Sequence, residues 1–437
     1  MAFMEKVGFT ARIFSWYAHA PPGIQVTGMN SVANSAPGKL PLDGIRVLEL
    51  GHIVAGPTAS LILADLGADV IKVERPDGGD QARNMPGASS GFYFFNRNKR
   101  SLALDLKTDQ GKHVFRKLVK SVDVCLDNYA PGALDRLGLS YPELAKLNPR
   151  LIYLAVKGFL PGPYEHRPSL DELAQMMGGL AFMTGPTGRP LRAGASVIDI
   201  GAATYGIIGV LAALHVRATT GRGQMITSGL FETSVFWVGQ WMARAVATGE
   251  ASFPMAEIGQ SVRMGWGIFH LFDTADKQQV FIGVTSNAHW ERLCREFGMA
   301  DLLADERLDN NAKRVAAQEW MLPRVRKVAM VFTSAQLQAK LEKASVPYAP
   351  VQRPDQLLED PHLLATGQLL STPMKDGKIG KLPKLPFNSS DYEFGLRRPA
   401  PGLGEHTREV LGEAGLSQGE IDALVSANVV LCGVPEK

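Results

Sequence analysis

Short apolar runs bounded by glycine and proline alternate with amphipathic segments from about residue 42 onward. The runs "IRVLEL" (45–50), "VIKVERP" (70–76), "VDVCLDNY" (122–129) and "LIYLAVKGF" (151–159) are typical of buried strands. The segments between them, and residues 172–183 and 200–217 after them, have the pattern of helices. Strands alternating with helices predict a parallel sheet covered on both faces, so we expect a large, doubly wound, Rossmann-like α/β domain.

The pattern changes in the second half of the chain. The stretch "GIFHLFDTADKQQVFIGV" (267–284) is typical of a β-hairpin, and amphipathic segments follow at 287–298, 312–330 and 333–343. We therefore predict a smaller α+β domain. The expected division is an extension over 1–41, the large domain over 42–230, linkers over 231–254 and 336–357, the small domain over 255–335, and a return to the large domain over 358–437.

The first 41 residues contain few acids and no clear strand or helix pattern. They are interpreted as a disordered extension, with an organelle-targeting leader as the alternative. A cytoplasmic location is expected, or a mitochondrial one if residues 1–28 are a leader. The apolar stretches 197–214 and 229–243 each carry an acid, Asp199 or Glu232, so we interpret them as core helices and expect no membrane partner.

The charge of the chain is nearly balanced, at +3 for 437 residues. This is too small to argue for a nucleic-acid partner, but clustered cations would suit an anionic ligand. Cations on loops at the edge of an α/β sheet are typical of a polyphosphate site, and solvated surface positions are the alternative. The candidates are Arg75, the run 96–100, Lys107 and Arg136.

Cysteine and histidine spacing limits the cofactor chemistry. The three cysteines lie far apart in the sequence, which suggests neither a CxxC pair nor a disulfide framework. The nine histidines have no metal-ligand spacing, so we predict no metal. The first strand–helix turn has only Gly51 and Gly56 in place of GxGxxG, which disfavours a dinucleotide. We expect no tightly bound cofactor.

The stretch "GASVID" (194–199) places a carboxylate, Asp199, in an otherwise apolar run. An aspartate at a helix start can be an N-cap, stabilised by the positive end of the helix dipole. An ordinary aspartate, with a pKa near 3.9, is also an ionised nucleophile at neutral pH. Both interpretations stay open from the residues alone. Asp171, before "ELAQMMGG", has the same N-cap interpretation.

Several stretches together resemble one protein family. They are "PLDGIRVLEL", "VAGPTASLILADLGADVIKVERPDGGD", "NRNKRSLALDLK", "DNYAPGALDRLGL", "NPRLIYLAVKGF", "GRGQ" and "GLGEHTREVL". From about Leu42 to the C-terminus the chain resembles the family III CoA-transferases of the CaiB/BaiF type. The resemblance implies an acyl-CoA and a carboxylic acid as substrates, and a homodimer of two interlocked rings. It also implies that Asp199 is the catalytic carboxylate, forming an aspartyl mixed anhydride and then an aspartyl-CoA thioester.

The resemblance further implies which residues contact the substrates. The loop 257–267 is interpreted as one that shields the intermediates, with Gly259, Gln260 and Ser261 as substrate contacts. Arg192 or Arg263 would bind a second carboxylate if the donor is succinyl-CoA or another short dicarboxylyl-CoA. The implied CoA contacts are Val54, Ala55, Arg75, Leu104, Lys107, Asn128, Tyr129, Ala130, Arg136 and Asp171.

Two alternatives to a transferase remain. The first is an α-methylacyl-CoA racemase, whose pattern has a histidine followed by an aspartate at 170–171. Here "PSLD" (168–171) keeps Asp171 but has Leu170, which cannot move protons. The second is a CoA-binding partner subunit without catalysis, which the intact Asp199 disfavours.

Overall fold

The computed structural model describes residues 39–86, 89–255, 265–374 and 377–433. The predicted extension, up to residue 38, lies outside these ranges. So do the predicted substrate contacts Gly259, Gln260 and Ser261, and so does Arg263.

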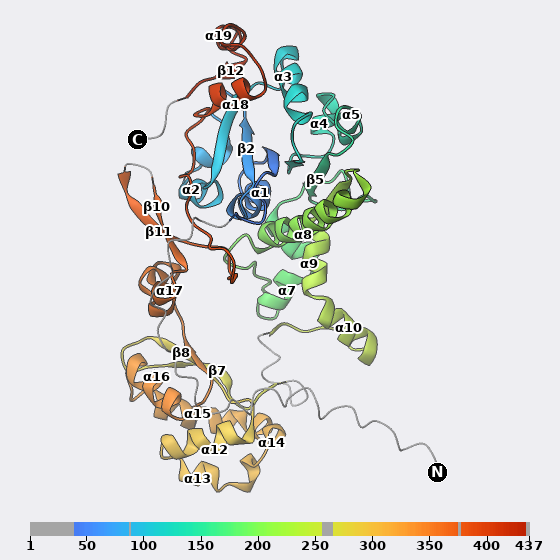
Figure 1. Cartoon of the computed structure of the whole chain (residues 1–437). Helices are drawn as coiled ribbons and strands as arrows, with labels where there is room; N and C mark the ends of the chain where they lie inside the picture. Colours follow the sequence, from blue (N-terminus) through green and yellow to red (C-terminus); the bar gives the residue numbers. More distant parts are fainter. Residues whose placement is uncertain (1–38, 87–88, 256–264, 375–376, 434–437) are drawn as a thin grey trace. The chain divides into compact units, whose positions relative to one another are not determined.

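A seven-stranded sheet with the order β12-β3-β2-β1-β4-β5-β6 is the centre of the α/β part (Figure 1). Strands β1 to β6 are parallel, and β12 joins the edge antiparallel to β3. The sheet confirms the predicted α/β class. Its strands are Arg46–Leu50 (β1), Asp69–Glu74 (β2), Lys99–Leu104 (β3), Val124–Asp127 (β4), Ile152–Lys157 (β5), Met225–Gly229 (β6) and Val430–Leu431 (β12).

Helices cover both faces of this sheet because its strands are apolar on both sides. Val47 of β1 packs into one core with α1 and α8, and the next residue, Leu48, packs into a second core with α3, α5, α18 and α19. The helices of the α/β part, with one 3-10 turn, are Ala55–Asp65 (α1), Gln81–Arg83 (η1), Ser90–Phe95 (α2), Asp109–Val119 (α3), Ala133–Arg136 (α4), Tyr141–Leu147 (α5), Asp171–Met177 (α6), Leu180–Thr184 (α7), Val197–Thr220 (α8), Leu230–Trp237 (α9), Gly239–Thr248 (α10), Thr407–Glu413 (α18) and Gln418–Ser426 (α19).

The helix predicted over 172–183 is two helices, α6 and α7, separated at Gly178 and Gly179. Gly179 has a φ of 84°, in the left-handed region that favours glycine. A Cβ on Gly178 would meet the Ser234 hydroxyl at 2.3 Å, so α9 can approach this turn only because residue 178 is a glycine. The break turns α7 away from α6 and leaves the N-terminus of α6 beside α8.

The predicted β-hairpin is present in a three-stranded antiparallel sheet of β7, β8 and β9. Its core contains Leu337, Leu341 and Val346, which lie beyond residue 335. The small core therefore takes in residues predicted to be a linker. The remaining elements are Phe269–Asp273 (β7), Gln279–Gly283 (β8), Asn287–Glu296 (α12), Ala300–Leu303 (α13), Glu306–Leu308 (η2), Asn311–Ala316 (α14), Gln318–Ala329 (α15), Ser334–Lys343 (α16), Tyr348–Pro350 (β9), Pro354–Glu359 (η3), Pro361–Ala365 (α17), Leu369–Pro373 (β10) and Ile379–Pro383 (β11).

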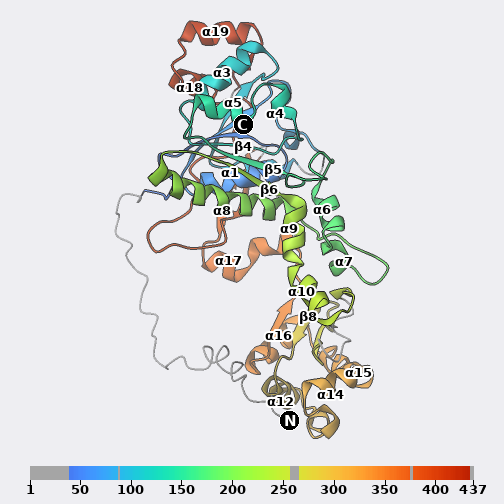
Figure 2. The same cartoon turned by 90° about the vertical axis from the view of Figure 1, so that its right-hand side faces the viewer.

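Helix α8 is long and apolar enough to cross a membrane by length and composition. One face of it is nevertheless part of the sheet core: Ala202, Ile207 and Val210 are buried there, and α1 and α8 lie side by side (Figures 1 and 2). A Cβ on Gly206 would meet Leu154 of β5 at 2.9 Å, so this glycine allows α8 to lie close to the sheet. The other face of α8 exposes apolar side chains, including Ile208.

Three of the cations expected to suit a polyphosphate are instead used inside the fold. Arg97 is 1% exposed and forms an ion pair with Asp65 at 2.6 Å. The ammonium of Lys99 is fully buried and lies 2.9 Å from Glu49, and Arg100 forms ion pairs with acids on β2 and α18. A charge run looks the same in sequence whether it faces solvent or buried acids, so this prediction was wrong for residues 97, 99 and 100.

Replacing Lys99 by methionine should destabilise the fold strongly. The change leaves the buried carboxylates of Glu49 and Asp80 with one cation, Lys72, between them. Loss of one member of a buried ion group costs about 3–5 kcal/mol. The matched control is Lys112→Met, whose ion pair with Asp109 lies at the surface and is worth less than about 1 kcal/mol. Urea unfolding curves measure both values, and equal midpoints for the two variants would contradict the structural role of Lys99.

Candidate active site

The strand order reverses between β1 and β4, which is where open α/β sheets bind ligands. The chain leaves β1 toward β2 on one side and leaves β4 toward β5 on the other, so the loops after β1 and β4 diverge and leave a crevice at the carboxyl ends of the strands. A cavity of about 410 Å³ lies there. Its lining residues are His52, Ile53, Val54, Ala55, Asn128, Tyr129, Ala130, Pro131, Val156, Lys157, Gly158, Arg167, Pro168, Ser169, Leu170, Asp171, Glu172, Ser196, Asp199 and Leu230.

This cavity brings together seven of the predicted site residues from four separate stretches of the chain. They are Val54, Ala55, Asn128, Tyr129, Ala130, Asp171 and Asp199. Arg75 lines a neighbouring hollow of about 260 Å³, which shares His52 and Tyr129 with the cavity. Leu104, Lys107 and Arg136 do not line either hollow.

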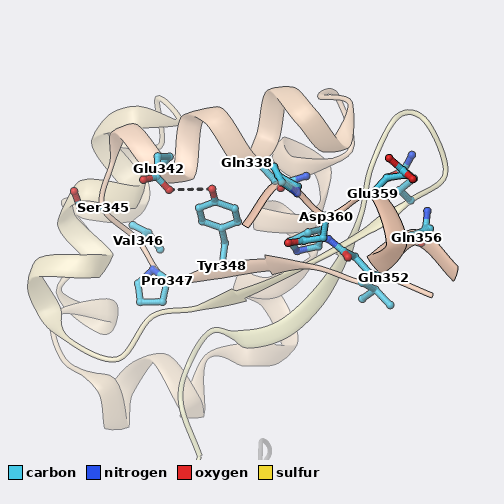
Figure 3. A pocket seen from close by; sticks show the side chains of 14 residues that line it. Gln338, Glu342, Ser345, Val346, Pro347, Tyr348, Gln352, Gln356, Glu359 and Asp360 are labelled. Carbon is cyan, nitrogen blue, oxygen red and sulfur yellow. Dashed lines mark hydrogen bonds between the residues drawn. The ribbon is translucent and has the colours of Figure 1, made fainter. Parts of the chain in front are cut away.

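A second, larger hollow of about 830 Å³ lies over the three-stranded sheet and contains none of the predicted residues (Figure 3). Several of its polar groups already have partners within the fold. The Tyr348 hydroxyl donates to Glu342 at 2.9 Å, and Asp360 accepts the backbone N–H of Leu363 at 3.0 Å. The smaller cavity is therefore the candidate active site.

The loop after β1 is held in a strained backbone conformation. Ile53 has a φ of 63°, which is a genuine outlier for a β-branched residue. Its N–H donates to Asp80 at 3.1 Å, and Asp80 in turn lies 2.9 Å from the buried ammonium of Lys72. Burial would raise the pKa of Asp80, but Lys72 outweighs burial and holds it below its ordinary value. An ionised Asp80 therefore holds the loop after β1 by accepting the N–H of Ile53.

Asn128 ties the loop after β4 to the loop after β1. Its side-chain oxygen accepts the N–H of His52 at 2.9 Å, and its side-chain nitrogen donates to the His52 carbonyl at 3.0 Å. A Cβ on Gly56 would lie 2.8 Å from the Asn128 side-chain oxygen, so this contact requires a glycine at the start of α1. The side chain of Asn128 is thus occupied in positioning the two loops.

Asp199 lies in the first turn of α8, but it is not the N-cap. The N-cap is Ser196, whose side chain makes no capping hydrogen bond. The carboxylate of Asp171 instead accepts the N–H groups of Ile198 at 2.8 Å and of Asp199 at 3.0 Å. Asp171 is the first residue of α6 and follows that helix's own N-cap, Leu170. The N-cap interpretations of both aspartates were therefore wrong, because Asp171 caps a different helix from its own.

Gln175, one turn further along α6, supports this arrangement and is fully buried. Its side-chain nitrogen donates to Asp171, and its side-chain oxygen accepts the N–H of Ala193 at 2.8 Å. One amide thus joins Asp171 to the segment that precedes α8. The capping carboxylate is held on one side by α8 and on the other by Gln175.

The carboxyl group of Asp199 titrates far from its usual range. Burial is the main cause and the nearby negative charge of Asp171 the second, and together they raise the pKa of Asp199 to about 7. The sequence-based assumption of an ordinary pKa was therefore wrong. The Asp199 side chain itself accepts no hydrogen bond from any described residue. Such a carboxyl group is partly protonated at neutral pH and free to react.

The remaining predicted cations are exposed, unlike the buried Arg97, Lys99 and Arg100. Arg75, Lys107 and Arg136 are exposed, and none of them has an ion-pair partner among the residues that the structure describes. They are free to bind an anion. Leu104, by contrast, is 1% exposed, so its side chain is not accessible to a ligand. Within the described ranges, no group of three or more His, Cys, Asp or Glu side chains could hold a metal ion.

Sequence reasoning missed three basic residues that line the cavity: His52, Lys157 and Arg167. Lys157 forms an ion pair with Asp127 and donates to the Tyr129 carbonyl at 2.8 Å, which fixes the loop after β4. Burial lowers the pKa of His52, so its ring is neutral. His52 and Lys157 stand at predicted strand ends, and this position was the available signal for both.

A parallel sheet with a cavity at its switch point, and a half-buried carboxyl group of raised pKa in that cavity, are typical of an α/β enzyme with carboxylate chemistry. The chain belongs to CoA-transferase family III, whose family model matches residues 42–407. It is 32% identical over 399 residues to succinyl-CoA–D-citramalate CoA-transferase of Chloroflexus aurantiacus, covering 89% of this chain and 98% of that one. It is 32% identical over 388 residues to succinate–glutarate CoA-transferase of Agrobacterium fabrum, covering 86% and 96%.

Solved structures agree with this assignment. A CaiB/BaiF family protein from Brucella suis has a TM-score of 0.78 and 31% identity to this chain, covering 86% of this chain and all of the other. The predicted resemblance to CoA-transferase family III is therefore confirmed.

Replacing Asp199 by asparagine should stabilise the protein more at pH 8 than at pH 5. A carboxyl whose folded-state pKa is raised lowers stability progressively as pH rises from the unfolded pKa, near 3.9, to the folded pKa, about 7. Asparagine removes this titration. With allowance for partial exposure, we expect the gain in unfolding free energy to be about 1–2 kcal/mol larger at pH 8 than at pH 5.

Urea unfolding at the two pH values measures this difference. Asp109→Asn is the matched control, since Asp109 is an exposed carboxylate in the first turn of another helix, α3. The control should show no such pH-dependent gain. A gain for Asp199→Asn that is the same at both pH values would contradict the raised pKa.

Proposed function

We propose that this chain transfers CoA from an acyl-CoA thioester to a free carboxylic acid, with Asp199 as the nucleophile. The observation that carries the proposal is the half-buried carboxyl group of Asp199, which has no partner among the described residues, in the switch-point cavity, with its pKa raised to about 7. A raised pKa keeps this group a stronger base than an ordinary aspartate, and hence a better nucleophile once ionised.

In the proposed reaction, an oxygen of ionised Asp199 attacks the thioester carbonyl carbon of the donor. A C–O bond forms, the C–S bond breaks, and CoA leaves as the thiolate, which gives a mixed anhydride. The thiolate then attacks the Asp199 carbonyl carbon, forming an Asp199–CoA thioester and freeing the donor carboxylate. An acceptor carboxylate repeats these two steps in reverse order. No cofactor and no external proton donor is needed.

The loops that line the two hollows are proposed to bind CoA. Val54, Ala55 and Ala130 line the cavity together with Asp199, while Arg75 lines the adjoining hollow. Because the side chain of Arg75 is exposed and forms no ion pair with any described residue, its guanidinium is proposed to bind a phosphate group. Lys107 and Arg136 are proposed to contact phosphates further from the reacting carbon.

Short dicarboxylates are the proposed acids. The Chloroflexus relative is named for succinyl-CoA and D-citramalate, and the Agrobacterium relative for succinate and glutarate. Succinate, D-citramalate and glutarate, the three acids in these names, each carry a second carboxylate. Arg192, one of the two arginines predicted to bind that group, forms an ion pair with Glu172 in the described structure, and Arg263 lies outside the described residues.

A homodimer is proposed as the working form. Helix α10 has no buried residue, and Val246 within it is 87% exposed. Phe236 on α9 and Ile208 on α8 are 70% and 56% exposed, so large apolar side chains are exposed on each of three successive helices. Exposed apolar side chains gathered into a patch are typical of a protein–protein interface. A second copy of the chain is the partner that the family resemblance implies.

The cavity lacks the histidine that the racemase pattern needs at position 170. Racemisation needs two groups that exchange a proton with opposite faces of one carbon. Leu170 lines the cavity at the position where a histidine would be needed, and the Asp171 carboxylate is occupied by two N–H donors. His166 does not line the cavity, and its ring nitrogen lies 3.1 Å from the Glu165 carboxylate.

Replacing Asp199 by alanine should lower CoA exchange by more than about a thousandfold, because the covalent intermediates can no longer form. CoA binding should stay within a few fold, since the proposed phosphate contacts are unchanged. Transfer between a panel of acyl-CoA donors and carboxylic acids, followed by mass spectrometry, measures the rate, and calorimetry measures CoA affinity. Asp109→Ala, an exposed first-turn carboxylate on α3, is the control and should retain full activity.

Two outcomes would contradict the proposal. Retention of more than a few per cent of the exchange rate by Asp199→Ala would exclude Asp199 as the nucleophile. Rapid deuterium incorporation from heavy water at the α-carbon of a 2-methylacyl-CoA, without an acceptor acid, would instead favour the racemase.

A further inference from the structure

Some charged side chains that line the candidate cavity have partners among the described residues, and others do not. Of the three acids in its lining, Asp171 is bound by two N–H groups and Glu172 forms an ion pair with Arg192, while Asp199 is unpaired. Of the basic residues in its lining, Lys157 is paired with Asp127, and the pKa of His52 is lowered by burial. Arg167 is therefore the one basic residue of the described lining that keeps a full positive charge without an acidic partner.

Arg167 is also held in place by an aromatic group. Its guanidinium carbon lies 4.8 Å from the centre of the Tyr164 ring. Tyr164 packs against Phe159 and Phe231, whose ring centres lie 5.6 Å and 6.3 Å from it. A guanidinium stacked on an aromatic ring keeps its N–H groups at the edge free for a carboxylate. The side chain is thus positioned without its charge being neutralised.

We infer that Arg167 recognises the second carboxylate of a dicarboxylate substrate, and so selects dicarboxylyl-CoA over monocarboxylyl-CoA. This inference rests on the proposed function. A dicarboxylate that reacts at Asp199 brings a second negative charge into a cavity already lined by three acids, and that charge needs a cation. Arg167 and Asp199 line the same cavity, and a guanidinium binds a carboxylate through two parallel hydrogen bonds.

The test uses binding, so that it does not depend on turnover. In an Asp199→Asn background, calorimetry would compare succinyl-CoA, butyryl-CoA and free CoA, with and without Arg167→Met. Succinyl-CoA and butyryl-CoA have acyl chains of the same length and differ in the terminal carboxylate. A charge-assisted hydrogen bond is worth about 1.5–3 kcal/mol, so Arg167→Met should lower the preference for succinyl-CoA about ten- to a hundredfold.

Arg222→Met is the matched control. Arg222 is an exposed arginine outside the cavity, and its replacement should change none of the three affinities. A parallel loss of affinity for all three ligands with Arg167→Met would show that Arg167 binds a CoA phosphate, and would overturn the inference. An unchanged ratio of succinyl-CoA to butyryl-CoA affinity would overturn it too.

Failure of the inference and failure of the proposed function are distinguishable. If the chain with Asp199 intact exchanged no CoA between any acids, the proposed function would fail while the binding ratio still reported on Arg167. If exchange occurred and Arg167→Met left its selectivity between succinyl-CoA and butyryl-CoA unchanged, only the inference would fail. Arg167→Lys separates charge from geometry: a lysine should restore part of the selectivity, since it keeps the charge but lacks the paired N–H groups.

Discussion

The carboxylate of Asp171, bound by the first N–H groups of α8, is the contact on which the candidate active site depends. It joins α6 to α8 and caps the N-terminus of α8, so that Asp199 lies in a first turn whose N–H groups the Asp171 carboxylate accepts. The N–H of Asp199 is therefore satisfied, and its own carboxyl group is left without a partner in a partly buried position. The same contact places a negative charge beside Asp199 and, after burial, is the second cause of its raised pKa. The Asp171 carboxylate therefore both positions Asp199 and contributes to its raised pKa.

The loops facing Asp199 depend on buried charge in a different way. Glu49, Lys72, Asp80 and Lys99 form a group below the loop after β1, and Asp80 reaches up to the N–H of Ile53. Burial alone would raise the pKa of Glu49, but Lys72 and Lys99 outweigh it and hold that pKa low. This group of buried charges therefore holds the loop after β1 in its strained conformation. Arg75 and Arg167 form no ion pair with any described residue, and in the proposed function they bind substrate anions.

The sequence predicted the sheet, the small hairpin and the family because those features rest on local patterns and on motifs. It also identified Asp199, since an acid in an apolar run is conspicuous. The cap on α8 could not be predicted, because it joins residues 171 and 198 through tertiary packing. The cations at 97, 99 and 100 were misread for the same reason: their partners, such as Glu49 and Asp65, lie far away in sequence. Arg167 lacked any signal in the sequence, because its proposed role depends on which other cations are already paired.

If Asp199 is the nucleophile, it becomes covalently bound to substrate in every turnover. The most direct measurement is chemical trapping: the protein is incubated with acyl-CoA, treated with hydroxylamine, digested and analysed by peptide mass spectrometry. An activated aspartyl ester or anhydride reacts with hydroxylamine to give a hydroxamate at the residue that carried it. We expect a hydroxamate at Asp199 that forms only when acyl-CoA is present. A hydroxamate at another acid, such as Asp171 or Glu172, or none while CoA exchange proceeds, would contradict this expectation.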